Sequence, residues 1–353
     1  MIDSTKRVHD ACRGTRPDRT PIFDLLLNDA VIEHFAGLPL DGTADEQTVL
    51  LAARNGLDAT RWIPVPDREG RTWTDPVGNV RIASRWTSWI QIHAMTDADQ
   101  WARWLRRHLD QLETDAPAEN THPQNALAEQ RALNAQLDGT VFIHSTPSTA
   151  VNEAMFGPSG CGLEIFSYLW ADEPDLLLRW LRTLERQQDR LIQRTAHAET
   201  ANLAMIYSDV AFKERLMFGK TMLNQLGFFD DVARICRQCH AAGLQVIFHS
   251  DGCVTDIMDD LIAAGIDGLN PIEKAAGMDI YQLRRRYPEL ILVGGVDVTH
   301  LLRIGSPDDV RRETRRIIDE VGAEGRLLIG SSTEVDDNVP LENYLAFHGE
   351  VCR

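Results

Sequence analysis

The sequence predicts an α/β fold made of parallel strand–helix units, and the stretch from Leu244 to Asp297 indicates this most clearly. Three short apolar runs of strand length alternate there with helical patterns; the runs are Leu244–Phe248, Ile266–Leu269 and Leu290–Val293. Between the first two runs, Thr255–Ala264 has apolar residues at spacings of one, three and four, which indicates an amphipathic helix. Strand, helix and strand at this pitch are typical of parallel βα units.

The first part of the chain fits the same pattern. Residues 1–20 are polar and charged, and they predict a helix or arm over the base of the fold. The run Pro21–Leu27 predicts the first strand, which places Asp24 and Asn28 near its carboxyl end. Helical periodicity follows in three segments, which are Val31–Ala36, Glu46–Asn55 and Asp97–Leu112.

A segment of different character lies at about residues 70–92. Two alternating runs flank a turn signal at Asp75–Gly78, and this pattern predicts an antiparallel β-hairpin. Farther along, Glu113–Asn125 contains two prolines and several acids, which favours a loop.

The remaining segments continue the strand–helix alternation. The expected strands are Thr140–His144, Leu203–Ile206 and Leu327–Ile329. The expected helices are Leu163–Trp170, Glu173–His197 and Asp230–Ala242. Because no internal repeat and no interdomain linker is visible in the sequence, we expect a single domain over residues 1–353.

The composition restricts the functional classes. The chain carries a formal net charge of −17, whereas binding to a phosphate backbone requires a basic surface, so we expect no nucleic-acid partner. No run of 18 apolar residues occurs, so no membrane span is expected. The first residues lack an apolar signal core and the six cysteines are scattered, which favours a cytoplasmic protein in a reducing compartment.

Polar side chains follow the predicted strands at the points where the strands end. The carboxyl ends of parallel strands meet at one edge of a sheet or barrel, so we expect a shared site there. We predict catalytic roles for His249, Asp251, Glu273 and Asp209. We predict substrate contacts for Asn28, Tyr207, Asn270, Asp297 and Ser332.

Each of these roles has a simpler alternative. His249 beside Asp251 can bind a divalent metal or act as a base, or it can only hydrogen-bond a substrate carboxylate or a loop. Glu273 is a candidate general acid or a ligand for a cationic or methoxylated substrate, and the alternative is a salt bridge to a loop arginine or lysine. Asp209 and Asp297 can each face the cleft or cap a helix.

The second half of the chain also contains six family-like motifs. They are DVAFKERLMFGKTML at 209–223, FHSDG at 248–252, AGIDGLNPIE at 264–273, GMDI at 277–280, GGVD at 294–297 and VPLENYLAF at 339–347. These motifs resemble the uroporphyrinogen decarboxylase superfamily, which includes the corrinoid and coenzyme M methyltransferases. The resemblance is strong from about Asp209 to the end and collinear before it. It implies a single (β/α)8 TIM barrel, with the hairpin of residues 70–92 as a lid over the mouth.

The resemblance also implies a metal site, with changed ligands. The methyltransferase branch holds zinc with a His-x-Cys segment and a second cysteine in the loop of the last strand. Here Asp251 stands at the first cysteine position, and the second falls at about Ser332 or Thr333. A site of His249, Asp251 and Glu334 is then the candidate, since zinc accepts oxygen ligands. The alternative is a metal-free pocket.

The same resemblance orders the candidate functions. Uroporphyrinogen decarboxylase itself binds its substrate's carboxylates with an N-terminal arginine-rich segment. This chain has no arginine between Arg19 and Arg54, which argues against the haem-pathway enzyme. We therefore predict a corrinoid-linked methyltransferase acting on a small methylated donor, with zinc as candidate cofactor and a corrinoid protein as candidate partner. The alternatives are a decarboxylase of a small aromatic or pyrrole-like acid and a non-catalytic barrel. A homodimer is compatible with the sequence.

Overall fold

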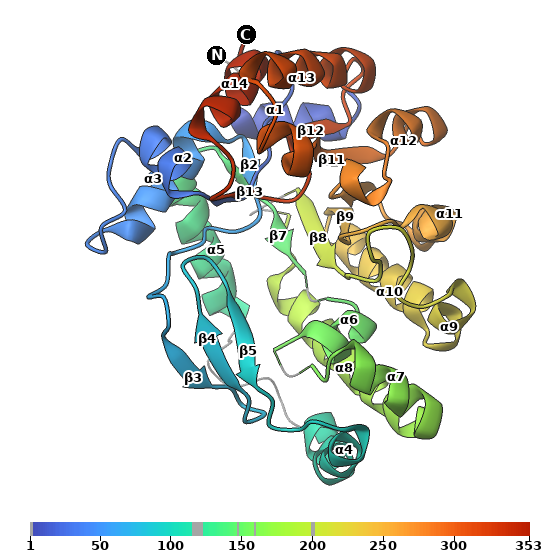
Figure 1. Ribbon diagram of the computed structural model, residues 1–353. Coiled ribbons are helices and arrows are strands. Elements are labelled where there is room, and N and C mark those ends of the chain that lie inside the picture. The colour runs from blue at the N-terminus through green and yellow to red at the C-terminus, as the bar shows by residue number, and fades with distance from the viewer. Residues whose placement is uncertain (1–2, 115–122, 147, 159, 199–201) are drawn as a thin grey trace.

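A six-stranded parallel sheet forms the centre of the computed structural model (Figure 1). The structure describes residues 3–114, 123–146, 148–158, 160–198 and 202–353. Hydrogen-bonded neighbours follow the order β12-β11-β10-β9-β8-β7, and every pairing is parallel. The strands are β7 (His144–Ser145), β8 (Leu203–Tyr207), β9 (Gln245–His249), β10 (Gly268–Asn270), β11 (Ile291–Val296) and β12 (Leu327–Ser331).

Shorter parallel pairings connect the two edges of this sheet. β2 (Ala59–Thr60) pairs with β6 (Val141–Phe142), which is followed almost directly in the chain by β7. Phe23 bridges to Ala59 of β2, and its neighbour Ile22 bridges to β12. The parallel pairings therefore pass through eight segments and return to the strand where they began. We call these eight segments together the ring. The parallel α/β fold predicted from the sequence is confirmed.

Alternate residues of these segments face the inside of the ring and form an inner apolar cluster. Its buried members are Val8, Ala11, Cys12, Phe23, Ala59, Ile143, Leu203, Met205, Ile247, Ile291, Val293 and Leu328. The first three come from α1 (Ser4–Cys12), and the Ala11 carbonyl accepts the Arg326 N–H at 2.6 Å, just before β12 begins. Helix α1 thus covers the amino ends of the strands, which leaves the carboxyl ends for a site.

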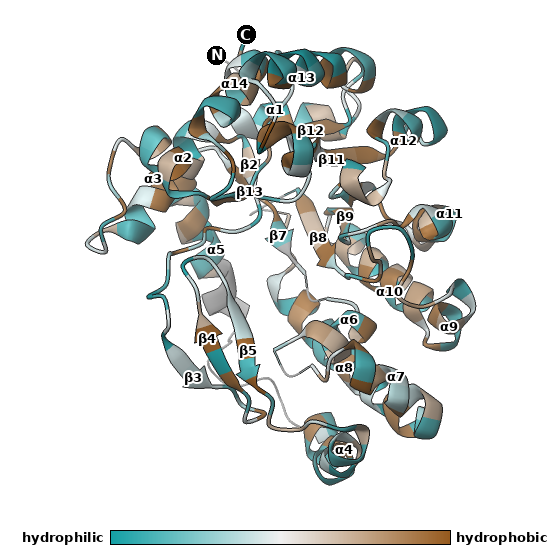
Figure 2. Cartoon of the chain, in the orientation of Figure 1, coloured by the Kyte–Doolittle hydropathy of each residue, from teal (hydrophilic) through white to brown (hydrophobic). Residues whose placement is uncertain are grey.

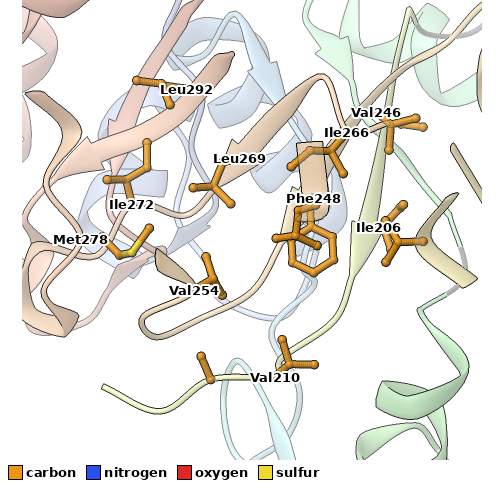
Figure 3. Packing of buried hydrophobic residues seen from close by; sticks show 14 of the residues in the cluster. Ile206, Val210, Val246, Phe248, Val254, Ile266, Leu269, Ile272, Met278 and Leu292 are labelled. Atoms are coloured by element: carbon orange, nitrogen blue, oxygen red, sulfur yellow. The ribbon is translucent and has the colours of Figure 1, made fainter. Parts of the chain in front are cut away.

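Helices surround the ring and pack on the strand residues that face outward. Figure 3 shows this outer cluster, in which Ile206, Phe248, Leu269 and Leu292 come from four neighbouring strands. In Figure 2, peripheral helices such as α13 carry hydrophilic colour, whereas β11 and β12 are mostly hydrophobic. The helices around the ring are α2 (Asp29–Ala36), α3 (Asp45–Gly56), α6 (Ala150–Phe156), α7 (Leu163–Asp172), α8 (Pro174–Thr195), α9 (Lys220–Gln225), α10 (Phe228–Ala241), η1 (Thr255–Ile257), α11 (Met258–Ala264), η2 (Lys274–Ala276), α12 (Ile280–Arg286), η3 (Val298–Leu302), α13 (Pro307–Val321) and α14 (Leu341–Val351).

An antiparallel sheet replaces the simple hairpin expected at residues 70–92 (Figure 1). Its strands are β3 (Thr72–Thr74), β4 (Val80–Ala83) and β5 (Ser88–Ile92). The predicted turn is present, since the Asp75 N–H donates to Asn79 O at 2.9 Å. The third strand follows a turn in which Ser84 N–H donates to Thr87 O at 2.8 Å. That turn contains neither glycine nor asparagine, so it gave no signal in the sequence.

Two further elements differ from the expectation. Helix α4 (Ala98–Thr114) is followed by α5 (Pro123–Leu137), whose start overlaps the predicted loop. Proline is tolerated at the first helical position, so Pro123 begins a helix here and does not mark a loop. The rest of that loop, residues 115–122, lies outside the described residues. The predicted first strand is split, because β1 (Leu26–Leu27) leaves the ring to pair with β13 (Val335–Asp336). Within the described residues, none of the helices has the length and apolar character that crossing a membrane requires.

Candidate functional site

Four side chains from four segments meet at the carboxyl end of the ring, which we call the mouth. Arg61, Tyr207 and His249 each lie two positions beyond an inner-cluster residue of the same segment, so strand alternation directs them inward. Asn270 ends β10 and follows Leu269, which faces the outer cluster. The Tyr207 and His249 ring centroids are 5.2 Å apart. The structure therefore brings together residues that lie more than two hundred positions apart in the sequence.

His249 is neutral near pH 7 and has a defined tautomer. Burial, followed by the Arg61 charge, lowers its pKa to about 4. Its Nδ1 lies 2.7 Å from Asn270 Oδ1. The Asn270 amide nitrogen donates to the Val293 carbonyl at 3.1 Å, so Oδ1 can only accept from the imidazole. The proton therefore lies on Nδ1, and Nε2 presents a lone pair to the mouth.

Two carboxylates face that lone pair. Asp209 Oδ1 and Asp251 Oδ1 each lie 3.9 Å from His249 Nε2. The ligating atoms of these three residues all lie within 4.8 Å of one another. Glu334, which the sequence suggests as a ligand, is not part of this group, and Asp209 takes that place. Asp209 follows β8, the direct neighbour of β9, whereas Glu334 follows β12, farther along the sheet.

The loop after β9 adopts a conformation that requires glycine. Gly252 has a φ of +84°, and a Cβ at this position would lie 2.5 Å from the Phe212 carbonyl oxygen. The Gly252 N–H donates to Glu273 Oε2 at 2.5 Å. The adjacent Asp251 N–H donates to Asp209 Oδ1 at 2.9 Å. Glu273, which the sequence predicts as a catalytic residue, therefore holds the loop that carries Asp251.

The mouth also concentrates negative charge. The pKa of Asp251 is raised to about 7, first by removal from water and then by three neighbouring acids, which are Asp209, Glu273 and Glu334. The Asp251 side chain keeps 53% of its surface exposed, so we attribute this shift chiefly to the like charges. Burial raises the pKa of Glu334 as well. A cation or a proton bound between these groups would relieve their repulsion.

Arg61 is a residue of the mouth that the sequence analysis missed. Its Nη1 donates to the Tyr207 hydroxyl at 3.2 Å, and its Cζ lies 5.1 Å from the Tyr207 ring centroid. Its charge lowers the pKa values of His249, Asp251 and Glu334. The signal in the sequence is its position two residues beyond Ala59, which is visible only when the two-residue strand β2 is recognised.

Three of the residues predicted to contact substrate hydrogen-bond backbone groups. Asn28 Oδ1 accepts from the first turn of α2, and its amide donates to two carbonyls near β13 at 2.7 and 3.0 Å. Asp297 caps η3 by accepting two N–H groups, which is one of its two predicted roles. Ser332 Oγ accepts the Val298 N–H at 3.1 Å. All three are buried and position the chain around the mouth.

Comparison with known sequences supplies the family. The model of the uroporphyrinogen decarboxylase (URO-D) family matches residues 227–352. This part of the chain is therefore similar to the URO-D family. The resemblance predicted from the sequence is thereby confirmed for the segment that carries His249, Asp251, Asn270 and Glu273. No curated protein sequence matches the chain.

Comparison with solved structures concerns the fold of the whole chain. A methyltransferase from Methanosarcina mazei superimposes with a TM-score of 0.67 at 15% identity, covering 100% of this chain and 99% of that one. At this identity the likeness concerns the fold. Dispersin B superimposes with a TM-score of 0.34 at 12% identity, covering 64% of this chain and 75% of that one. A chitinase from Chromobacterium violaceum superimposes with a TM-score of 0.37 at 8% identity, covering 94% of this chain and 99% of that one. Both TM-scores are too low to indicate a shared fold.

Proposed function

We propose that this chain is a (β/α)8 barrel methyltransferase of the URO-D family that binds a divalent cation through Asp209, His249 and Asp251. The proposal depends on one observation. The unprotonated Nε2 of His249 faces two carboxylate oxygens, each at 3.9 Å. A lone pair directed at two anions is unfavourable unless a positive centre lies between them. Protonation of the imidazole would supply such a centre, but its pKa of about 4 leaves it neutral near pH 7.

The spacing of the three ligand atoms fits a zinc-sized ion. Two atoms bound to one zinc at about 2.1 Å each are at most about 4.2 Å apart. The two distances from His249 Nε2 satisfy this limit. The two carboxylate oxygens lie within 4.8 Å of each other, so at most a small side-chain rotation would bring them within this limit. Asn270 supplies the outer hydrogen bond to the ligating imidazole that metal sites usually have.

The donor set also bears on the chemistry. A bound divalent ion would lower the pKa of a thiol or polarise an oxygen on the substrate. One nitrogen and two carboxylates make a harder ligand set than the thiolates of the methyltransferase branch, which favours a substrate that binds through oxygen. We therefore propose a small methoxylated donor, with a corrinoid on a partner protein as the methyl acceptor. The shared fold with the Methanosarcina mazei methyltransferase supports this reaction class.

A decarboxylase is the second candidate, and the Asp251 pKa favours it. An acid with a pKa of about 7 can hold a proton at neutral pH and transfer it to a carbanion left by loss of carbon dioxide. In that case the proton on Asp251 relieves the repulsion in the mouth, and no metal is required. The two candidates therefore differ in what neutralises the acids.

Metal binding is the first experiment. Zinc binding would be measured by elemental analysis and calorimetry on wild type, His249→Ala, Asp209→Asn and Asp251→Asn. We expect one ion per chain in wild type, loss in His249→Ala, and at least about 10-fold weaker binding in the two aspartate variants. Glu334→Gln is the matched control, since it removes a mouth carboxylate outside the proposed ligand set. Equal zinc contents in all five proteins would exclude this site.

Turnover separates the reaction classes. Methyl transfer is supported if reduced cob(I)alamin and a methoxylated donor give methylcobalamin, followed by absorbance, together with the demethylated alcohol or phenol. Carbon dioxide release from a small acid by metal-free protein supports the decarboxylase. A protein with neither activity that still binds a ligand tightly would be a non-catalytic barrel, and the methyltransferase proposal would then be wrong.

A further inference from the structure

Arg61 lies in the mouth and makes few interactions with the side chains around it. It is half-buried and follows β2, and strand alternation directs it toward Tyr207 and His249. A guanidinium group has five N–H donors. The hydrogen bond that Arg61 makes to the described residues runs from Nη1 to the Tyr207 hydroxyl at 3.2 Å. Most of its donor capacity therefore remains for a bound molecule.

The Arg61 Nε in particular is a buried donor without an acceptor. Its accessible surface is close to zero, and it has no hydrogen-bond partner among the described residues. An unpaired buried donor destabilises the folded state, and it does so more strongly when the group is charged. A bound ligand is one way in which such a group becomes paired.

The unpaired Nε of Arg61 is unusual, because acidic side chains lie close to this arginine. Arg61 lowers the pKa of Asp251 and of Glu334 through its charge. Arg303 affects the same Glu334, and its Nε is also unpaired within the described part of the chain, but its guanidinium is ion-paired with Asp336. Among the described residues Arg61 has no such ion pair, so its charge is available to an incoming anion.

The position of Tyr207 indicates how long a ligand must be to reach from Arg61 to His249. The Arg61 guanidinium lies 5.1 Å from the Tyr207 ring centroid, and that ring lies 5.2 Å from the His249 ring. The Arg61 guanidinium and the His249 ring thus both lie close to the Tyr207 ring. A molecule of a few bonds, lying along that ring, can reach both the guanidinium and the side chains around His249 Nε2.

We propose that Arg61 binds the carboxylate of the substrate, so that the substrate class is a small methylated carboxylic acid. A planar carboxylate fits the guanidinium fork in a bidentate manner and would provide the acceptor that Nε lacks. With the anion at Arg61, the other end of the molecule is directed toward Asp209, His249 and Asp251. The identity of the methylated end of the substrate rests on the proposed function. The carboxylate end rests on Arg61 alone.

The test uses ligand pairs that differ in charge. The full-length protein, loaded with zinc or metal-free, is titrated by calorimetry with methoxyacetate against 2-methoxyethanol, and with 4-methoxybenzoate against 4-methoxybenzyl alcohol. Wild type should bind a carboxylate at least about 10-fold more tightly than its alcohol. Arg61→Met should remove this preference by weakening carboxylate binding at least about 10-fold more than alcohol binding. Arg61→Lys should keep part of it, because the charge remains without the fork.

Controls keep the outcomes distinct. Arg303→Met removes an arginine near the same acids whose charge is already paired, and it should retain the preference for the anion. Equal weakening of acid and alcohol in Arg61→Met would show a role only in tuning the acids, and it would overturn the proposal. A wild type without any preference for the carboxylates would overturn it too. Zinc content, measured on the same samples, reports separately on the proposed metal site.

Discussion

Asn270 accepts the Nδ1–H of His249 at 2.7 Å, and this single hydrogen bond decides what the imidazole can do. The amide of Asn270 cannot turn over without losing its bond to the Val293 carbonyl. Because one nitrogen of the ring is committed, the other is left as an acceptor or ligand. The site is therefore built from β9 and β10 together, and neither strand specifies it alone.

Replacement of Asn270 by alanine should release the imidazole. We expect zinc affinity to fall by about 10–100-fold, which is usual for loss of the outer partner of a ligating histidine. Nitrogen-15 NMR of the His249 ring should show a mixture of tautomers in place of the single Nδ1–H form. Unchanged affinity and an unchanged ring spectrum would contradict the assignment.

Leu269→Ala provides the matched control from the other face of β10. Leu269 is fully buried in the outer cluster, and its truncation should lower the free energy of unfolding by about 2–5 kcal/mol. Zinc affinity should stay within a factor of two or so of wild type, since the side chain points away from the mouth. Chemical denaturation and calorimetry on both variants would separate stability from binding.

A methyl group at Gly252 should disturb the site more than its backbone conformation alone predicts. Gly252→Ala places a Cβ 2.5 Å from the Phe212 carbonyl, whereas Gly277 has a similar φ of +86° and open space around its Cβ. Gly277→Ala should lower the free energy of unfolding by about 1 kcal/mol, and Gly252→Ala by clearly more. Only Gly252→Ala should weaken zinc binding, because it displaces Asp251. Similar losses in both variants would argue against the close contact.

Asn28→Ala should reduce stability without affecting ligands. The change removes a helix cap, which typically contributes about 0.5–2 kcal/mol, and leaves two buried carbonyls without their donor. We expect a lower melting temperature with unchanged zinc and carboxylate affinities, measured by calorimetry. A selective loss of ligand affinity at unchanged stability would instead support the substrate contact predicted from the sequence.

Asp24 should make the stability depend on pH. This buried carboxyl accepts from the Ser331 hydroxyl at 2.6 Å, yet burial raises its pKa from 3.8 to about 7. Between these values the folded state holds a proton that the unfolded state has released, so stability decreases as pH rises from about 4 to 7. Asp24→Asn should make that slope shallower by about 1.4 kcal/mol per pH unit, measured by urea denaturation at several pH values. A slope identical to that of wild type would show that Asp24 is ionised throughout.

The parallel α/β fold could be predicted because local patterns carry it. The runs around Phe248, Leu269 and Leu292 have strand length and are separated by segments of helical period, and each became a strand. The turn at Asp75–Gly78 was also readable, since turn residues report their own backbone conformation. Weak local signals were missed, as with β2, whose two residues are too few to show a period.

The composition of the site was only partly readable. The sequence alone determined that His249, Asp251 and Asn270 lie at or just after the ends of two successive predicted strands, because alternation and apolar runs are properties of consecutive residues. Only the tertiary structure decided that Asp209 rather than Glu334 completes the group, that Glu273 supports a loop, and that Arg61 enters the mouth. Those outcomes depend on which strands are adjacent and how far their loops reach. Distances between segments far apart in the chain are set by packing and are not encoded in any local period.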